Sequence, residues 1–170
     1  MGADSITTLR GRCLIFHLAD RTYGLPTKCI EEIVPMAELT TMPGAPAFLA
    51  GFLGMGGQLV AVISLRRLLG MPDRERELYT PLVILRALPQ QIAIEIDGVT
   101  RIVDFSDVEV VPIAGKCSLN DCATAVIRLD GQSILLLSPE RILLEQELRR
   151  VAELAELTRQ RLAMVETVST

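Results

Sequence analysis

The stretches GQLVAVISLRRLL, residues 57–69, and GQSILLLSPERILL, residues 131–144, decide the fold of this chain. Both begin with Gly-Gln and carry a serine seven positions after the glycine. Each pattern predicts a turn, an apolar strand and a short amphipathic helix. Asp130 and Glu140 bound the second apolar run, so that run is far too short to cross a bilayer. We therefore expect both copies to be buried strands of one repeated β unit.

The first copy lies in a long uncharged region that suggests two other structures. Residues 39–65 carry no charge, and 27 such residues would suffice for one membrane crossing. Gly51, Gly54, Gly56 and Gly57 oppose a transmembrane helix, because each costs about 1 kcal/mol relative to alanine. A phosphate-binding loop is also disfavoured, since a strand rather than a helix N-terminus follows these glycines. Gly56-Gly57 instead predicts a tight turn in which the second glycine supplies a positive φ.

The composition limits the class of protein. The length of 170 residues suits one domain or two small subdomains with a shared core. Hydrophobic residues make up 49% and aromatic residues 4%, with no tryptophan, which predicts an aliphatic core. The net charge of −4 is spread along the chain without a basic stripe, so nucleic acid is not an expected partner.

The four cysteines do not form a recognisable metal motif. They lie at positions 13, 29, 117 and 122, and a single C-x4-C pair lacks the further ligands of a structural zinc site. We expect reduced, mostly buried thiols and no metal or cofactor. The first twelve residues contain no apolar signal region, and a cytoplasmic location is the expectation.

Further patterns along the chain predict a mainly β protein. Residues 13–26 form a predicted hairpin, whereas the apolar spacing in residues 27–34 predicts one or two helical turns. Asp97-Gly98 and Asp130-Gly131, each between apolar runs, predict two more hairpin turns. Short strands at this spacing are typical of a barrel or a sandwich.

Two serines lie where a predicted strand stops and a helix starts. Ser64 and Ser138 are therefore expected to cap these helices, with Pro139 at the first helical position. A nucleophilic role is disfavoured, because no G-x-S-x-G motif surrounds either serine and His17 is the only histidine. The sequence does not predict an enzyme.

A long helix is expected at the C-terminus, over residues 139–166. Apolar or small side chains alternate in steps of four and three along it, which predicts one buried stripe. The helix is too short to predict a coiled coil. Its stripe could therefore pack against the β subdomains, or against a partner helix or a second copy of the chain, and the sequence does not favour either. The stripe consists of Leu144, Leu148, Val151, Ala155, Thr158, Leu162 and Val165.

Four separated segments resemble the CheW-like coupling proteins of bacterial chemosensory arrays. They are FHLADRTYGLPTKCIEEIV, PGAPAFLAGFLGMGGQLVAVISLR, IAIEIDGVTRIV and DGQSILLLSPERILL, in that order. The resemblance covers residues 12–146 and implies two intertwined SH3-like subdomains, each a five-stranded β-barrel, that share an aliphatic core. It also implies a non-enzymatic adaptor that links chemoreceptor tips to a CheA-type histidine kinase.

The resemblance assigns a kinase contact to the segment after the first hairpin. Ile30 and Glu32 match the positions by which family members contact the CheW-like regulatory domain of the kinase. The alternative from the residues themselves is that Ile30 belongs to the core and that Glu32 is simply solvated.

A second assignment concerns the glycine-rich segment. Gly51 and Gly57 match the glycines of the family pattern G-x-x-N-L-R-G, which lines the receptor-facing groove, whereas Gly54 and Gly56 replace its Asn and Arg. An adaptor with altered receptor docking is thus one expectation. The alternative is a divergent CheW-like regulatory module, outside motility, that does not bind standard receptors.

Overall fold

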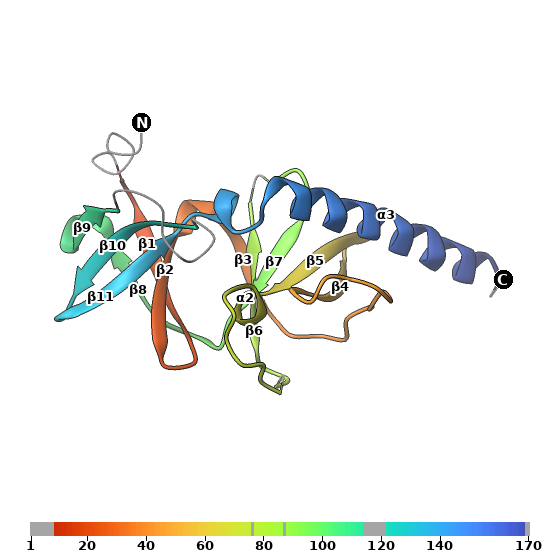
Figure 1. Ribbon diagram of the computed structural model, residues 1–170, viewed down its shortest axis with the longest axis horizontal. Coiled ribbons are helices and arrows are strands. Elements are labelled where there is room, and N and C mark those ends of the chain that lie inside the picture. Colours follow the sequence, from red (N-terminus) through yellow and green to blue (C-terminus); the bar gives the residue numbers. More distant parts are fainter. Residues whose placement is uncertain (1–8, 76, 87, 114–121, 169–170) are drawn as a thin grey trace.

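The computed structural model describes residues 9–75, 77–86, 88–113 and 122–168. Their strands form two sheets, one at an end of the molecule and one at its centre (Figure 1). Sheet A has the order β8-β1-β2-β11-β10-β9 and sheet B the order β3-β6-β7-β5-β4. The strands of sheet A are β1 (Arg12–Leu18), β2 (Arg21–Pro26), β8 (Gly98–Asp104), β9 (Glu109–Pro112), β10 (Ala123–Leu129) and β11 (Gln132–Leu137). Those of sheet B are β3 (Ile30–Pro35), β4 (Leu49–Met55), β5 (Gln58–Ser64), β6 (Pro81–Leu85) and β7 (Ile92–Glu95).

The repeat seen in the sequence is a repeat of sheet topology. In sheet B the β4–β5 hairpin joins β7 through a parallel pairing of β5, and in sheet A the β10–β11 hairpin joins β2 through a parallel pairing of β11. Five strands of sheet A therefore follow the same order as the five strands of sheet B, and β9 is an addition. This confirms the mainly β fold, and the arrangement is consistent with two SH3-like barrels.

The two sheets exchange strands. β3 follows β2 in the chain but pairs with β6 of sheet B, and β8 follows β7 but pairs with β1 of sheet A. The hairpin predicted at Asp97-Gly98 is therefore wrong, because this dipeptide leads the chain from one sheet to the other. The backbone at Gly98 lies close to the His17 ring, and a Cβ at this position would be only 2.6 Å from the ring. This position therefore needs a glycine.

Of the one or two helical turns predicted over residues 27–34, only a first turn forms, and the prediction is wrong from residue 30 onward. A short 3₁₀ turn, η1 (Thr27–Cys29), precedes β3, which pairs antiparallel with β6. Ile30, Ile33 and Val34 are β-branched and suit a strand, and the pairing with β6 outweighs their helical spacing. Ile30 and Glu32 thus lie on the edge strand of sheet B.

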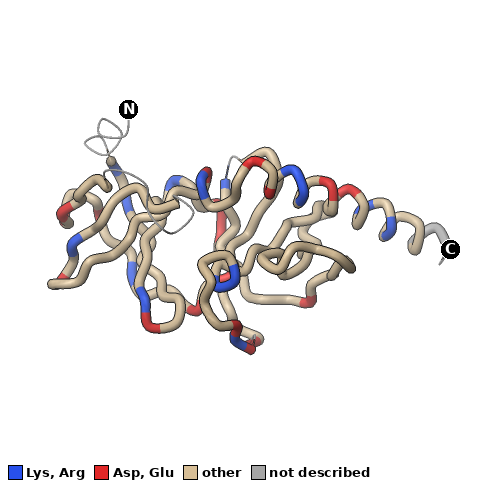
Figure 2. The backbone as a smooth tube through the Cα atoms, in the orientation of Figure 1, with Lys and Arg blue, Asp and Glu red and all other residues tan. Residues whose placement is uncertain are grey.

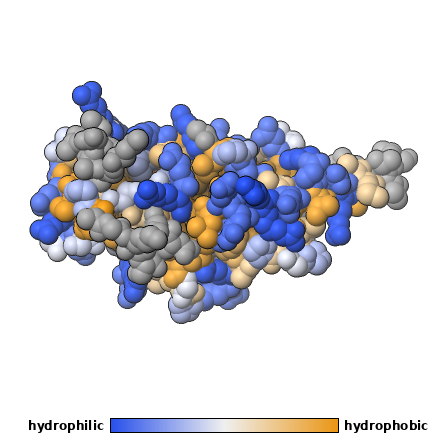
Figure 3. Space-filling view, turned by 45° about the horizontal axis from the view of Figure 1, so that its top comes forward, coloured by the Kyte–Doolittle hydropathy of each residue, from blue (hydrophilic) through white to orange (hydrophobic). Residues whose placement is uncertain are grey.

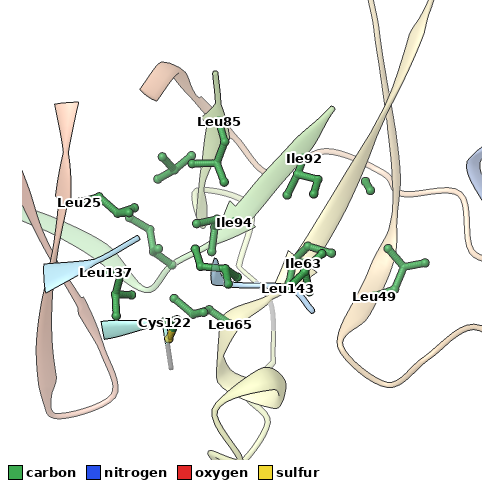
Figure 4. Packing of buried hydrophobic residues seen from close by; sticks show 14 of the residues in the cluster. Leu25, Leu49, Ile63, Leu65, Leu85, Ile92, Ile94, Cys122, Leu137 and Leu143 are labelled. Atoms are coloured by element: carbon green, nitrogen blue, oxygen red, sulfur yellow. The ribbon is translucent and has the colours of Figure 1, made fainter. Parts of the chain in front are cut away.

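The main core cluster fills the space between the sheets. It joins Leu25 and Leu137 of sheet A to Ile63 and Ile94 of sheet B (Figure 4). Cys122 is buried in the same cluster, whereas Cys117 lies outside the described residues. The core is predominantly aliphatic, in agreement with the composition.

A carboxylate connects the two sheets where the chain crosses between them. Asp97 Oδ2 accepts a hydrogen bond of 2.6 Å from the backbone N–H of Ala19, in the β1–β2 turn. Its Oδ1 accepts one of 3.0 Å from Arg66 Nε, in the short helix α2 (Leu65–Leu68) that follows β5, and Arg66 Nη2 also donates to Oδ2. Burial raises the pKa of Asp97, but these hydrogen bonds and the nearby guanidinium groups outweigh it and leave the pKa below its ordinary value.

The two predicted serine caps differ. Ser64 Oγ accepts a hydrogen bond of 3.4 Å from the backbone N–H of Arg67 and caps α2, as expected. The cap predicted at Ser138 is wrong, because its side chain makes no capping bond to the 3₁₀ turn η3 (Pro139–Arg141). Pro139 does lie at the start of this turn, where its missing N–H leaves no unpaired donor.

Helix α3 (Glu145–Val168) begins six residues later than predicted, after η3. Glu147 accepts a hydrogen bond of 2.7 Å from the Leu144 backbone N–H and so satisfies one free donor at the helix start. The centre of the helix contacts β5, and its end extends past sheet B (Figure 1). In the described part of the chain, no helix is long and apolar enough to cross a membrane.

The apolar stripe of α3 is buried only along its middle. Val151, Leu154, Ala155 and Thr158 are buried, so the β subdomain is the partner of this part of the helix. Further along, Leu162 and other apolar side chains are exposed, and apolar surface reaches the end of α3 in Figure 3. A partner helix or self-association at this exposed end stays a prediction.

Candidate protein interaction site

Strand β3 presents the residues matched to the kinase contact in two different environments. Ile30 is half-buried and packs against the main core, whereas Glu32 is exposed. Ile33, next along the strand, is 43% exposed. A β-bulge between Ile30 and Glu32 leaves Glu31 as an extra residue without a partner position on β6. Among the described strands β3 pairs with β6 alone, so no described strand covers its outer edge.

The four glycines of the β4–β5 segment have different roles. Gly51 is buried at a β-bulge, and a Cβ there would lie 2.9 Å from Leu39 Cβ, so this position needs a glycine for packing. Gly54, Gly56 and Gly57 are exposed, and a Cβ at any of them would meet nothing within 4 Å. Only these three belong to an accessible surface.

The turn itself differs from the expectation that the second glycine alone supplies a positive φ. Gly56 has φ +55° and Gly57 has φ +80°. Both central residues of this two-residue hairpin turn are left-handed, which matches the right-handed twist of the flanking strands. A side chain at Gly56 would have open space but would cost about 1–2 kcal/mol of backbone strain.

The β4–β5 turn borders a cleft of about 510 Å³. The start of β3, the β6–β7 loop and α3 form its other sides. Leu59 and Leu85, both buried, contribute apolar walls, and the amides of Gln58, Gln90 and Gln91 line it as well.

Of the described residues that line the cleft, two are charged, Glu31 from β3 and Arg159 from α3. Arg159 is the single cationic group among the described residues that border it. Its Nη1 donates a hydrogen bond to Glu156 Oε2 on the same helix. Figure 2 shows that α3 carries charges of both signs along its length, so the cleft adjoins a mixed rather than a uniformly charged helix.

Two thiols of the described residues have raised pKa values. Burial raises the pKa of the Cys13 thiol to about 12, which leaves it protonated and inert. Burial also raises the pKa of Cys29. Among the described residues, no group of three or more His, Cys, Asp or Glu side chains could hold a metal ion.

Comparison with known proteins agrees with the fold. Residues 12–147 match the CheW-like domain. The chain belongs to this family. The CheW-like resemblance that the four sequence segments predicted is thereby confirmed.

Relatives include the chemotaxis protein CheW of Rhizobium meliloti (strain 1021), which is 24% identical over 140 residues, 81% of this chain and 90% of that protein. The chemotaxis protein CheW of Helicobacter pylori (strain ATCC 700392 / 26695) is 26% identical over 129 residues, 75% of this chain and 78% of that protein. The crystal structure of the scaffolding protein TtCheW from Thermoanaerobacter tengcongensis matches with a TM-score of 0.69. That match covers 77% of this chain and 86% of the other at 20% identity, and it supports the fold alone.

Sequence reasoning did not find Arg159. The residue lies outside the CheW-like match, and in the sequence it is one of several arginines on the polar side of a predicted helix. Its place in the cleft that Gly57 and Gln58 also line depends on how α3 packs against sheet B. The available signal was the apolar stripe, which predicts that α3 packs but does not specify against which end of the barrel.

Proposed function

We propose that this chain is a cytoplasmic, non-enzymatic adaptor of a bacterial chemosensory pathway. In this proposal it binds the regulatory domain of a CheA-type histidine kinase through β3 and a chemoreceptor tip at the cleft. The observation that carries the proposal is the lining of that cleft by both Glu31 and Gly57. The segment matched to the kinase contact and the turn matched to the receptor contact therefore border one cleft, which would hold the two partners side by side.

The open edge of β3 supports the kinase contact. Exposed strand edges can pair with strands of other chains. On β3 the carboxylate of Glu32 and the apolar side chain of Ile33 are both exposed, so a partner could contact a charge and an apolar group together. Ile30 contributes by holding the strand against the core. We therefore assign the direct contact to Glu32 and a supporting role to Ile30.

The test is a titration of the purified chain with the isolated regulatory domain of a CheA-type kinase. We expect Glu32→Lys to weaken binding tenfold or more, because reversal of a charge inside an interface is repulsive, while the thermal midpoint stays almost unchanged. Glu109→Lys, on β9 of the other sheet, is the matched exposed control and should bind like the natural chain. Equal affinity of both variants and the natural chain would remove β3 from the interface, and failure of the natural chain to bind would reject the kinase-adaptor function.

One observation favours the second candidate, a regulatory module that does not bind standard receptors. The β4–β5 turn of this chain carries no side chain at Gly56, where the family pattern has Arg. Titration with a chemoreceptor-tip fragment, in the presence of the kinase domain, separates the two functions. Kinase binding without receptor binding would favour the second one.

A further inference from the structure

Helix α3 forms one side of the cleft and is firmly held there. Val151, Leu154, Ala155 and Thr158 are all buried against the β subdomain. Thr158 Oγ1 also donates a hydrogen bond of 2.7 Å to the Leu154 carbonyl. Arg159 follows Thr158 directly, so its backbone belongs to the last well-anchored turn of the helix.

The next arginine on the helix points elsewhere. Arg161 lies two residues further, about 200° around the helix axis. Its Nη1 is 4.0 Å from Met42 Sδ, and Arg161 is not among the residues that line the cleft. The two arginines are thus a natural pair of test and control positions on one helix.

The β4–β5 turn of this chain supplies no cation to the cleft. Both of its central residues are glycines with positive φ, a conformation that strains a long cationic side chain. The space around Gly56 and Gly57 is open, so a partner can approach the turn backbone closely. Among the described residues that line the cleft, Arg159 of α3 is the one that carries a positive charge.

We propose that Arg159 determines partner specificity at the cleft by binding a carboxylate of the receptor tip. This inference rests on the proposed function and adds the chemistry of its receptor contact. A guanidinium binds a carboxylate through two parallel hydrogen bonds, which fixes orientation as well as adding affinity. Glu31 lines the same cleft and repels a second carboxylate, so it sets the direction in which an acidic segment can lie.

The experiment titrates the full chain with a chemoreceptor-tip fragment at low and high salt. Arg159→Gln should weaken binding about tenfold to hundredfold, the effect of one charge-assisted hydrogen bond or slightly more. Arg161→Gln, with the same change of net charge, should bind like the natural chain. The affinity of the natural chain should fall as salt is added, whereas that of Arg159→Gln should change less.

A relocated charge tests the role directly. Gln58→Arg in the Arg159→Gln background returns a guanidinium to the cleft from strand β5 and should recover at least part of the lost affinity. Equal affinity of Arg159→Gln and the natural chain, or equal losses in Arg159→Gln and Arg161→Gln, would overturn the inference and leave the proposed function standing. A natural chain that binds the kinase domain but not the receptor tip would instead reject the receptor half of the proposed function. Loss of kinase affinity in Arg159→Gln would assign the cleft to the kinase and overturn the receptor assignment.

Discussion

The carboxylate of Asp97 offers a direct test of how the two sheets are held together. Asp97→Asn keeps the size of the side chain but removes its charge. The variant leaves the Arg66 guanidinium, whose side chain is 11% exposed, without its main counter-charge. Removal of one partner from a buried ion pair typically costs 3–5 kcal/mol. Arg66 keeps a hydrogen bond of 3.0 Å to the Pro72 carbonyl, so we expect the lower end, about 3 kcal/mol.

The same group predicts a dependence on pH. The pKa of Asp97 is lower in the folded chain than in the unfolded chain, where it lies near 4. Its contribution to the free energy of unfolding is therefore fully present above about pH 4 and is lost as the pH falls through the folded-state pKa. Because Asn does not titrate, the difference between the natural chain and Asp97→Asn should shrink below about pH 4.

Urea unfolding at pH 7 and pH 3 measures both effects. The control is Asp104→Asn, which removes the partner of Arg12 in a pair of 3.5 Å whose side chains are 52% and 68% exposed. This exposed pair should change the free energy of unfolding by no more than about 0.5 kcal/mol. A loss below 1 kcal/mol in Asp97→Asn at pH 7, or a difference that does not depend on pH, would refute the role assigned to Asp97.

Two further predictions concern the core. Leu154→Ala, in the buried part of α3, should lower the free energy of unfolding by about 2–5 kcal/mol, whereas Leu157→Ala, 46% exposed on the same helix, should change it by less than about 0.5 kcal/mol. Similar urea midpoints for the two variants would show that α3 does not belong to the folded core. The buried Tyr23 hydroxyl has no hydrogen-bond partner among the described residues, so Tyr23→Phe should raise the free energy of unfolding by about 1 kcal/mol while retaining the ring contact with Phe16. A thermal midpoint lowered by several degrees would reveal a partner for this hydroxyl.

The sequence alone determined the parts of this protein that depend on local geometry. The Gly-Gln repeat predicted two similar strand units, Asp130-Gly131 predicted the β10–β11 turn, and Ser64 predicted a helix cap. In each case the residues that set the backbone angles or the capping bond are neighbours in the chain. The apolar stripe likewise predicted the C-terminal helix, because its spacing follows the helical period.

The tertiary structure decided what depends on distant segments. Asp97-Gly98 has the composition of a hairpin turn, but β8 pairs with β1 instead of β7, and the dipeptide becomes the connection between sheets. Residues 27–34 have helical spacing, but from residue 30 onward they pair with β6 and form a strand. Of the candidate site, the sequence supplied Glu32 and the exposed glycines, whereas Arg159 enters the cleft only because α3 packs across sheet B. Local patterns fix backbone angles, but strand partners and the neighbours of a helix are chosen by burial and pairing between segments that lie far apart in the chain.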